Sequence, residues 1–366
     1  MGSRVVVTGA NGFIGSHLVE RLLERGDDVR AMVRKTARLD NLEGCAPTLV
    51  HASLADTDSM AAAFDGAEIV YHVAGLTAAF TRAEFDRANL EGTRNVLAAI
   101  QAARRPPRRL VLVSSLMAAG PSHPEVARRE HHSPRTDVTL YGDSKLAGER
   151  LAYAAARAGE VEVVIVRPPA VYGPRDEDVL QMIRSAKFGV IAQPGLRPTW
   201  MSFIHARDLV EGIVLAGARG RSIPRGDAPH ALGDGGCPDD HVPEDPSHPA
   251  GEGIYFFTDG DRHTVVSFGK AAAAALGRRA LAIPFPRAAV WTMAGVNQAI
   301  GRLRGEAPAL TLDKARGSMA SGWWCDDSRA RSELGMVAPR ESFYQVVPRP
   351  GSLSKSIRPP SLRTIP

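Results

Sequence analysis

The chain has 366 residues, of which 44% are hydrophobic and 23% are charged. This composition is typical of a globular protein with one large core and a smaller lobe, and it excludes a fibrous or wholly disordered chain. Most of the net charge of +5 lies in the basic segment 337–366, which favours a solvated tail over a nucleic-acid surface.

Neither a leader peptide nor a membrane span is expected. The apolar run that begins at Val5 follows Arg4 directly, without the basic region and cleavage site of a signal peptide. The longest apolar stretches are too short, and too often interrupted by charge, to cross a bilayer. Cys45, Cys237 and Cys325 show neither disulfide nor zinc spacing. We therefore expect a cytoplasmic protein with free thiols, no metal and no membrane insertion.

Short runs rich in β-branched residues alternate with helical stretches over the first half of the chain, which predicts a parallel sheet with crossover helices. The predicted strands are Arg4–Thr8, Asp28–Val33, Thr48–His51, Ile69–Val73, Arg109–Ser114 and Glu162–Arg167. Apolar residues at helical spacing predict one helix after the first strand, from Leu18 to Leu23, and another over Asn89–Ala103. The pattern indicates a doubly wound α/β Rossmann domain over residues 1–168.

Beyond residue 168 the sequence is less regular and richer in proline, glycine and aromatic residues, which predicts a substrate-binding lobe over 169–336. Within it, 217–253 has few large apolar residues and is expected to be a flexible loop, with no histidine or cysteine spacing that would fix a metal. Regular structure should return in a strand at Gly253–Thr258 and in helices near Ser267–Leu276 and Ala288–Leu303. Segment 337–366 is predicted to be a disordered basic tail.

The strongest local signal is a glycine-rich turn between the first strand and the first helix. It reads Thr8-Gly9-Ala10-Asn11-Gly12-Phe13-Ile14-Gly15. Glycines at this spacing permit a tight turn and close approach of the backbone to a pyrophosphate, and they leave N–H groups free at a helix N-terminus, where an anion is favoured. In its strand–turn–helix setting, the motif predicts a dinucleotide site rather than a purely structural turn.

A second signal is the pair Tyr141 and Lys145, which lie one turn apart on a predicted helix. An ammonium near a phenol favours the phenolate and lowers the pKa of the tyrosine, so that it can exchange protons near neutral pH. Ser115 follows a strand at its carboxyl end, where ligands bind in open α/β sheets, and its hydroxyl can orient a substrate oxygen. A tyrosine–lysine pair is common on any helix, but together with Ser115 and the glycine turn it favours catalysis.

In these motifs the chain resembles the extended short-chain dehydrogenase/reductases, also called the NAD-dependent epimerase/dehydratase family. The resemblance covers about Arg4 to Met336, apart from 217–253. It also rests on four further motifs: His72-Val73-Ala74-Gly75, Asn89-Leu90-Glu91-Gly92-Thr93, Arg167-Pro168-Pro169-Ala170-Val171-Tyr172-Gly173-Pro174 and Phe203-Ile204-His205-Ala206-Arg207-Asp208. They are specific for the family but not for a substrate.

The resemblance implies that Ser115, Tyr141 and Lys145 form a catalytic triad, and that Lys145 also holds the nicotinamide ribose. The other implied cofactor-binding residues are Gly9, Asn11, Gly12, Phe13, Ile14, Gly15, Arg34, Lys35, Ser53, Leu54, Ala74, Gly75, Asn89, Ser114 and Pro168. His205 and Asp208 are expected where the two lobes meet, either as a structural hydrogen-bonded pair or in contact with substrate. Helices that flank the active-site face often pair two subunits in this family, so a homodimer is a further expectation.

Two departures from the family pattern bear on the cofactor. Members that prefer NAD carry an acidic residue at the end of the second strand, where this chain has Val33 followed by Arg34 and Lys35. Two cations suit the 2′-phosphate of NADP, although they also fit two solvated loop charges. Ser53 stands where aspartate is common. The expected cofactor is NADP, with NAD as the alternative.

The substrate is indicated by two features. Ala170 replaces the asparagine that nucleotide-sugar enzymes tend to carry two residues before the Tyr172-Gly173 pair. Segment Phe285–Trp291 is similar to the 3β-hydroxysteroid dehydrogenase-like branch. We therefore predict an oxidoreductase that interconverts a secondary alcohol and a ketone on a small apolar substrate. A nucleotide-sugar epimerase or dehydratase, and a non-catalytic NADP-binding regulatory protein, are the alternatives.

Overall fold

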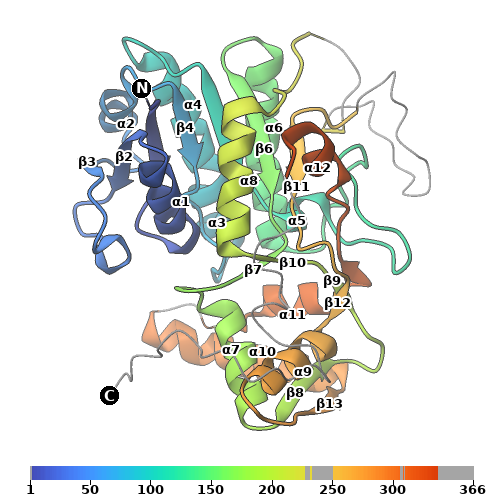
Figure 1. Ribbon diagram of the computed structural model, residues 1–366. Coiled ribbons are helices and arrows are strands. Elements are labelled where there is room, and N and C mark those ends of the chain that lie inside the picture. The colour runs from blue at the N-terminus through green and yellow to red at the C-terminus, as the bar shows by residue number, and fades with distance from the viewer. Residues whose placement is uncertain (1, 227–230, 233–249, 306–307, 309, 337–366) are drawn as a thin grey trace.

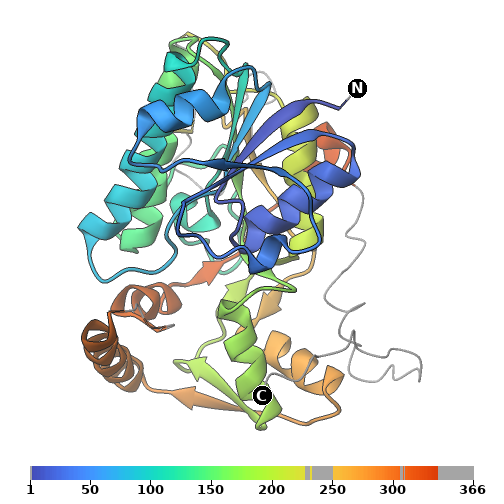
Figure 2. The same ribbon diagram turned by 90° about the vertical axis from the view of Figure 1, so that its left-hand side faces the viewer.

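The computed structural model describes residues 2–226, 231–232, 250–305, 308 and 310–336 (Figure 1). A twisted parallel sheet with helices on both faces forms the upper part of the molecule, and a smaller lobe of helices and short strand pairs lies below it (Figure 2). The upper part is the doubly wound Rossmann arrangement that the sequence predicts.

Seven strands form the main sheet in the order β11-β6-β5-β4-β1-β2-β3, and all neighbours are parallel. They are β1 (Arg4–Thr8), β2 (Asp28–Val33), β3 (Thr48–His51), β4 (Ile69–His72), β5 (Arg109–Val113), β6 (Glu162–Arg167) and β11 (Ile254–Phe256). The six strands predicted from the first half of the chain are confirmed, with β4 and β5 each one residue shorter. The strand order runs outward in one direction from β1 to β3 and in the other direction from β4 to β11. The switch point at which such sheets bind ligands therefore lies at the carboxyl ends of β1 and β4.

Each face of the sheet is covered by its own set of helices, because the central strands are apolar on both sides. On β1, Val5 and Val7 pack on one face, while Val6 packs on the other. The first face is covered by α1 (Phe13–Glu24), α8 (Ala206–Arg219) and α12 (Ser328–Leu334). The second face is covered by α2 (Thr57–Phe64), α4 (Gly92–Ala102) and α6 (Leu140–Arg157).

The helix predicted over Asn89–Ala103 exists, but its beginning differs from the prediction. A π-helical segment, η2 (Asp86–Glu91), follows the short helix α3 (Arg82–Phe85) and leads into α4. The predicted apolar residues of α4 face the core, since Val96, Leu97 and Ile100 are buried. Two further short elements of this part are η1 (Asp40–Leu42) and α5 (Leu116–Ala119).

Within the described residues, the lower lobe contains three small sheets and four helices. The sheets pair β7 (Ala170–Tyr172) with β10 (Phe203–His205), β9 (Trp200–Met201) with β12 (His263–Thr264) and β14 (Gly322–Trp323), and β8 (Val190–Pro194) with β13 (Leu281–Phe285). The helices are α7 (Asp178–Lys187), α9 (Val265–Ala275), α10 (Arg287–Arg304) and α11 (Leu312–Ser318). The helices predicted near Ser267–Leu276 and Ala288–Leu303 are thereby confirmed. The division at residue 168 stays a prediction; β11, α8 and α12 return from the later part of the chain to the main sheet.

The prediction of a loop over 217–253 is wrong at its first residues, which complete helix α8. Gly217 lies on that helix so close to the core that a Cβ there would approach the Tyr71 hydroxyl to 2.3 Å. Composition alone concealed this, because a glycine near a helix end reads as a break. Residues 227–230, 233–249 and the predicted tail 337–366 lie outside the described residues.

Within the described ranges, the structure has no helix long and apolar enough to cross a membrane. Among the same residues, no group of histidine, cysteine and carboxylate side chains is arranged to hold a metal ion.

Candidate active site

The glycine turn is held by contacts that leave little room for larger side chains. Gly9 has a left-handed backbone, with φ of +67°, and a Cβ on it would lie 2.8 Å from Ala74 Cα. A Cβ on Gly15 would lie 2.1 Å from the Gly9 carbonyl oxygen. Gly12 differs, because its φ of −78° suits any residue and a Cβ there meets only the Gly9 oxygen, at 3.2 Å. Gly9 and Gly15 therefore serve the fold, whereas Gly12 keeps space open in front of helix α1.

Helix α1 begins at Phe13 without a side-chain cap. The N–H groups of its first turn, which includes Ile14, therefore have no capping side chain to accept their hydrogen bonds, and with the helix dipole they form an anion site. Asn11 bridges this turn to the loop after β2, since its Nδ2 donates to Arg38 O at 3.1 Å and its own carbonyl accepts from Asn41 Nδ2 at 3.0 Å.

That loop carries the two predicted NADP-selecting cations. Arg34 and Lys35 are both exposed, and among the described residues neither has an ion pair or a side-chain hydrogen bond. Because Asn11 ties the loop to the glycine turn, both cations are held at the same edge of the sheet as the uncapped N-terminus of α1. Cations without an ion-pair partner at this position suit a phosphate group in addition to the pyrophosphate expected at the N-terminus of α1.

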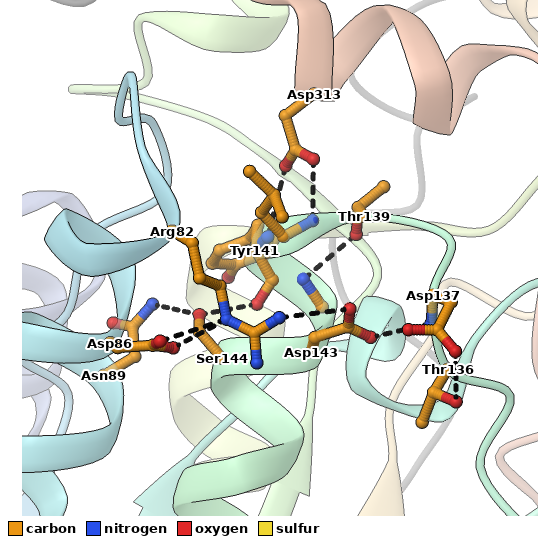
Figure 3. Close-up of polar contacts among 12 residues, drawn as sticks. Arg82, Asp86, Asn89, Thr136, Asp137, Thr139, Tyr141, Asp143, Ser144 and Asp313 are labelled. Carbon is orange, nitrogen blue, oxygen red and sulfur yellow. Dashed lines mark hydrogen bonds and ion pairs between the residues drawn. The ribbon is translucent and has the colours of Figure 1, made fainter.

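The loop after β4 is fixed by Asn89, which lies in η2 and is buried. Its side chain accepts from Leu76 N at 2.9 Å and donates to Leu76 O at 3.0 Å. It also donates to Ser144 Oγ at 2.9 Å (Figure 3). A Cβ on Gly75 would come within 2.8 Å of Asn89 Oδ1 and 3.6 Å of Lys145 Nζ. Asn89 thus joins the β4 loop, which carries Ala74 and Gly75, to the helix of the predicted catalytic pair.

A neutral histidine lies beneath this loop. Thr8 Oγ1 is 2.8 Å from His72 Nδ1 and accepts from Ala74 N at 3.2 Å. Burial, with a smaller contribution from the nearby Lys145 ammonium, lowers the pKa of His72 to about 3. His72 therefore carries no charge at neutral pH and acts as a hydrogen-bonding spacer between β1 and β4.

Ser53 and Leu54 lie after β3, at the side of the predicted adenine end. Leu54 O accepts from Asn95 Nδ2 at 2.7 Å, and its side chain would lie 3.1 Å from a Cβ on Gly92. Ser53 Oγ accepts from Ala55 N at 3.3 Å and stays half-buried. Both residues line the edge beyond β2, so their predicted place beside the cofactor fits the topology.

The serines after β5 are set by backbone bonds to the β6 end. Ser114 N donates to Val166 O at 2.7 Å, and Leu116 N donates to Pro168 O at 2.8 Å. Ser115 caps the short helix α5 by accepting from Met117 N at 3.1 Å. Ser114 Oγ is buried with no partner among the described residues, at the carboxyl edge where the family motifs place a cofactor.

Tyr141 and Ser115 are the two hydroxyl groups of the site, and hydrogen bonding to Ser115 acts to lower the pKa of the Tyr141 phenol. Tyr141 is in the first turn of α6, whose N-cap Thr139 accepts from Gly142 N at 3.0 Å. Its ring packs beside Phe85, with 5.9 Å between centroids. The serine and tyrosine of the predicted triad are therefore in contact.

The carboxylate of Asp313, from α11 in the lower lobe, is a further part of the site. It accepts from Leu140 N at 2.6 Å and from Tyr141 N at 3.1 Å (Figure 3). A negative charge at this position is favoured by the helix dipole of α6. Sequence reasoning missed Asp313, since no local motif marks it and the contact joins residues 172 positions apart.

The prediction that Lys145 lowers the pKa of Tyr141 is wrong for the protein without bound cofactor. Burial of the phenol dominates and raises the pKa of Tyr141 to about 12, against a smaller lowering from its hydrogen bond with Ser115. Burial also lowers the pKa of Lys145 to about 8, although the Glu149 carboxylate raises it. The charge of Lys145 is therefore what pH changes most readily in this site.

Lys145 is held in place by the strand and by its own helix. Its Nζ donates to Val113 O at 2.7 Å, at the carboxyl end of β5. One turn further along α6, Glu149 forms a fully buried two-bond ion pair with Arg167, at 2.6 and 2.9 Å. This ion pair fixes α6 to the end of β6, next to Pro168. It therefore helps to hold the Lys145 ammonium at the carboxyl end of the sheet.

His205 and Asp208 lie at the junction of sheet and lobe, as expected. His205 caps α8 by accepting from Arg207 N at 3.4 Å, and its ring packs edge-on against Tyr172 at 5.3 Å. Both His205 and Asp208 are buried. These contacts are those of a structural role, and a substrate contact of either residue stays a prediction.

The chain matches the model of the NAD dependent epimerase/dehydratase family over residues 5–229. Ceramide reductase of Caulobacter vibrioides is 34% identical over 210 residues, which are 57% of this chain and 59% of that protein. The 4-hydroxy-2-methyl-3-oxo-4-farnesyl-3,4-dihydroquinoline-1-oxide ketoreductase of Stigmatella aurantiaca is 29% identical over 91% of both chains. The 3 beta-hydroxysteroid dehydrogenase/Delta 5-->4-isomerase of Mycobacterium tuberculosis is 29% identical over 62% of each.

Solved structures show the same fold at lower identity. The UDP-glucuronic acid 4-epimerase of Bacillus cereus, in complex with UDP-glucuronic acid and NAD, superposes with a TM-score of 0.66 at 18% identity. The match covers 93% of this chain and 95% of that one. The likeness extends over the main sheet and the lower lobe together.

Proposed function

Because the chain belongs to the NAD dependent epimerase/dehydratase family, as its motifs predicted, we propose that it is an NADP-preferring oxidoreductase. It interconverts a secondary alcohol and a ketone on a small apolar substrate. The observation that carries this proposal is that Tyr141 and Lys145 lie one turn apart on α6, with the Lys145 ammonium bound to Val113 O at 2.7 Å, two residues before Ser115.

The residues at the switch point fit a dinucleotide. Gly12 keeps space open before the uncapped N-terminus of α1, and Ser114 offers a buried hydroxyl without a protein partner among the described residues. The glycine turn and first helical turn, with Asn11, would hold the pyrophosphate, and Ser53 and Leu54 would flank the adenine. Ala74 and Gly75 would line the cofactor on its adenine side, Ser114, Lys145 and Pro168 would line the nicotinamide half, and Asn89 would hold the β4 loop in place.

The two free cations support a preference for NADP. Arg34 and Lys35 follow β2 where the ribose 2′ position is expected, and no acidic residue stands beside them in the sequence. A guanidinium binds a phosphate through charge-assisted hydrogen bonds. NAD lacks that phosphate and would gain nothing from either side chain.

The proton chemistry belongs to Tyr141. When bound, the nicotinamide supplies or accepts the hydride. With a pKa near 12, Tyr141 keeps its proton at neutral pH and is set to donate it to the oxygen of a ketone as that oxygen gains negative charge. Ser115 donates to the same oxygen and orients it, and the Lys145 ammonium stabilises the phenolate that remains. At neutral pH the free protein therefore holds Tyr141 in the protonated form that donates to a ketone oxygen.

An apolar substrate is supported by the lobe. A cavity of about 720 Å³ lies there, lined mainly by segment 194–200, by Pro286 and Arg287, and by 318–321. Gly317, which precedes the lining residue Ser318, packs near the start of α6, because a Cβ on it would be 3.3 Å from the N-cap residue Thr139. Relatives named for ceramide, a farnesyl compound and a hydroxysteroid act on molecules with large apolar parts.

The decisive experiment is a turnover assay with NADPH and NADH against ketones of increasing apolar size. Oxidation of NADPH, followed at the nicotinamide absorbance band, with product alcohol identified by mass spectrometry, is the expected result. Conversion of a UDP-sugar to its epimer without net absorbance change would instead establish an epimerase. Tight NADPH binding without turnover on any compound would favour a regulatory protein.

A further inference from the structure

Helix α10 carries its large apolar residues on the side that faces away from the protein. Met293, Val296, Ile300 and Leu303 recur at spacings of three and four, so they form one stripe along the helix. Their exposed fractions are 49%, 53%, 42% and 89%. An ordinary surface helix buries such a stripe.

The opposite side of α10 is buried, and part of it packs in a small hydrophobic cluster with Ala315 of α11. Val290, Ala294, Gln298 and Gly301 face the protein. Gln298 Oε1 accepts from Leu312 N at 3.0 Å, which fixes α10 on α11. The exposed stripe is therefore not a result of a detached helix. The hydrogen bond between Gln298 and Leu312, on the opposite side of the helix, fixes the orientation in which the stripe faces solvent.

A second apolar surface leads directly into this helix. Strands β8 and β13 pair in parallel, with Val190 beside Leu281 and Ala192 beside Ile283, and these four residues are all exposed. The intervening Ile191 is buried against α9, where a Cβ on Gly269 would meet it at 2.8 Å. Strand β13 ends one residue before α10, in the lobe below the main sheet (Figures 1 and 2).

The chain segments that form these surfaces carry only positively charged side chains. Residues 262–305 include seven lysines and arginines and no aspartate or glutamate, and residues 179–207 contain no acidic residue either. Five arginines of this lobe are exposed and make no ion pair with any described residue: Arg197, Arg278, Arg279, Arg287 and Arg304. Exposed apolar residues flanked by free cations fit a surface that is apolar beneath an anionic layer.

We propose that the outer face of α10 and of the β8–β13 pair docks on a bilayer that contains anionic phospholipid. The apolar stripe enters the boundary between headgroups and acyl chains, and the arginines bind the phosphates. The inference does not depend on the proposed reaction, since it rests on the surface alone.

A second copy of the chain is a poorer occupant of this face. A two-fold dimer brings the same patch of both subunits together, so the arginines of one would oppose those of the other. Like charges across an interface disfavour association.

The test is flotation of the full chain with vesicles. Vesicles of equal parts phosphatidylglycerol and phosphatidylcholine should carry the protein, and vesicles of phosphatidylcholine alone should carry much less. Binding should fall when salt rises from about 0.1 M to about 1 M, because the screening length shortens from about 10 Å to about 3 Å. Absence of the protein from both vesicle fractions would overturn the proposal.

Two variants assign the binding to this face. The pair Arg287→Gln and Arg304→Gln should weaken binding to anionic vesicles roughly 20-fold or more, at about fivefold for each arginine. Leu303→Glu should weaken it on the order of tenfold or more. Leu49→Glu on β3, an equally simple change at an exposed leucine of the main sheet, and Arg94→Gln on α4 are matched controls that should bind as the wild type does.

The outcomes separate a bilayer from a dimer. Both control and test variants should keep the wild-type melting temperature and the same mass in analytical ultracentrifugation. Equal loss of vesicle binding in Leu49→Glu and Leu303→Glu would overturn the assignment to α10. A wild-type dimer that Leu303→Glu converts to a monomer would show that a second copy covers the stripe, and would also overturn it.

Discussion

Replacing Tyr141 with phenylalanine removes one oxygen from the proposed proton donor and leaves its surroundings in place. The ring should stay beside Phe85, since their packing does not involve the hydroxyl. The hydrogen bond to Ser115 is lost, which costs about 1 kcal/mol of folding free energy. Turnover should fall roughly 10²–10⁴-fold, the usual contribution of general acid catalysis, while the Kd for NADPH changes little.

The pH dependence follows from two pKa values. Tyr141, with a pKa near 12, stays protonated between pH 6 and 10. Its titration therefore causes no decline of the reduction rate in this pH range. Lys145, near 8, is charged below that pH and loses its charge above it. Because the ammonium stabilises the phenolate that forms during reduction, the wild-type rate should decline above about pH 8. In Lys145→Met this decline should be absent and the rate low at every pH.

The assay is initial-rate reduction of an accepted ketone from pH 6 to 10, with cofactor binding measured by calorimetry. Tyr153→Phe is the matched control, because it deletes a hydroxyl from the same helix α6 at a position outside the site. It should turn over as the wild type does. A Tyr141→Phe enzyme with near wild-type turnover would refute the proposed proton transfer, and leave a dinucleotide-binding fold.

Much of the Rossmann part could be predicted because its signals are local. Strands buried on both faces are short apolar runs, and the turn at Gly9–Gly15 has a fixed spacing, so element order and cofactor edge follow from pattern alone. The structure also explains why the three glycines are not equivalent. Gly9 and Gly15 are packed against backbone, and only Gly12 faces open space. That distinction is not visible in the motif.

The parts that sequence reasoning missed depend on tertiary contacts. Asp313 reaches the catalytic helix only because α11 folds against it, and nothing near either residue in the sequence announces the contact. The Tyr141 pKa was mispredicted because a spacing of four shows that Lys145 is near, but not that the phenol is buried deeply enough for desolvation to dominate. Helix α10 was predicted, but the outward orientation of its apolar stripe depends on the docking of Gln298.

Three further changes test the site. Gly12→Val should fold, since its φ of −78° suits any residue and its Cβ meets only the Gly9 oxygen, at 3.2 Å, but calorimetry should show a large loss of NADPH affinity. Arg34→Gln should weaken NADPH binding by about tenfold or more with NADH unchanged, because it removes a charge-assisted contact of roughly 1.5–3 kcal/mol; equal loss for both cofactors would exclude a 2′-phosphate contact. Asp313→Ala should lower turnover more than cofactor affinity, because it releases the N–H groups of Leu140 and Tyr141 and so loosens the first turn of α6. Lys314→Met, which breaks only the ion pair of α11 with α7, is its control, and an equal loss of turnover there would show that the docking of α11, rather than the Asp313 carboxylate, positions Tyr141.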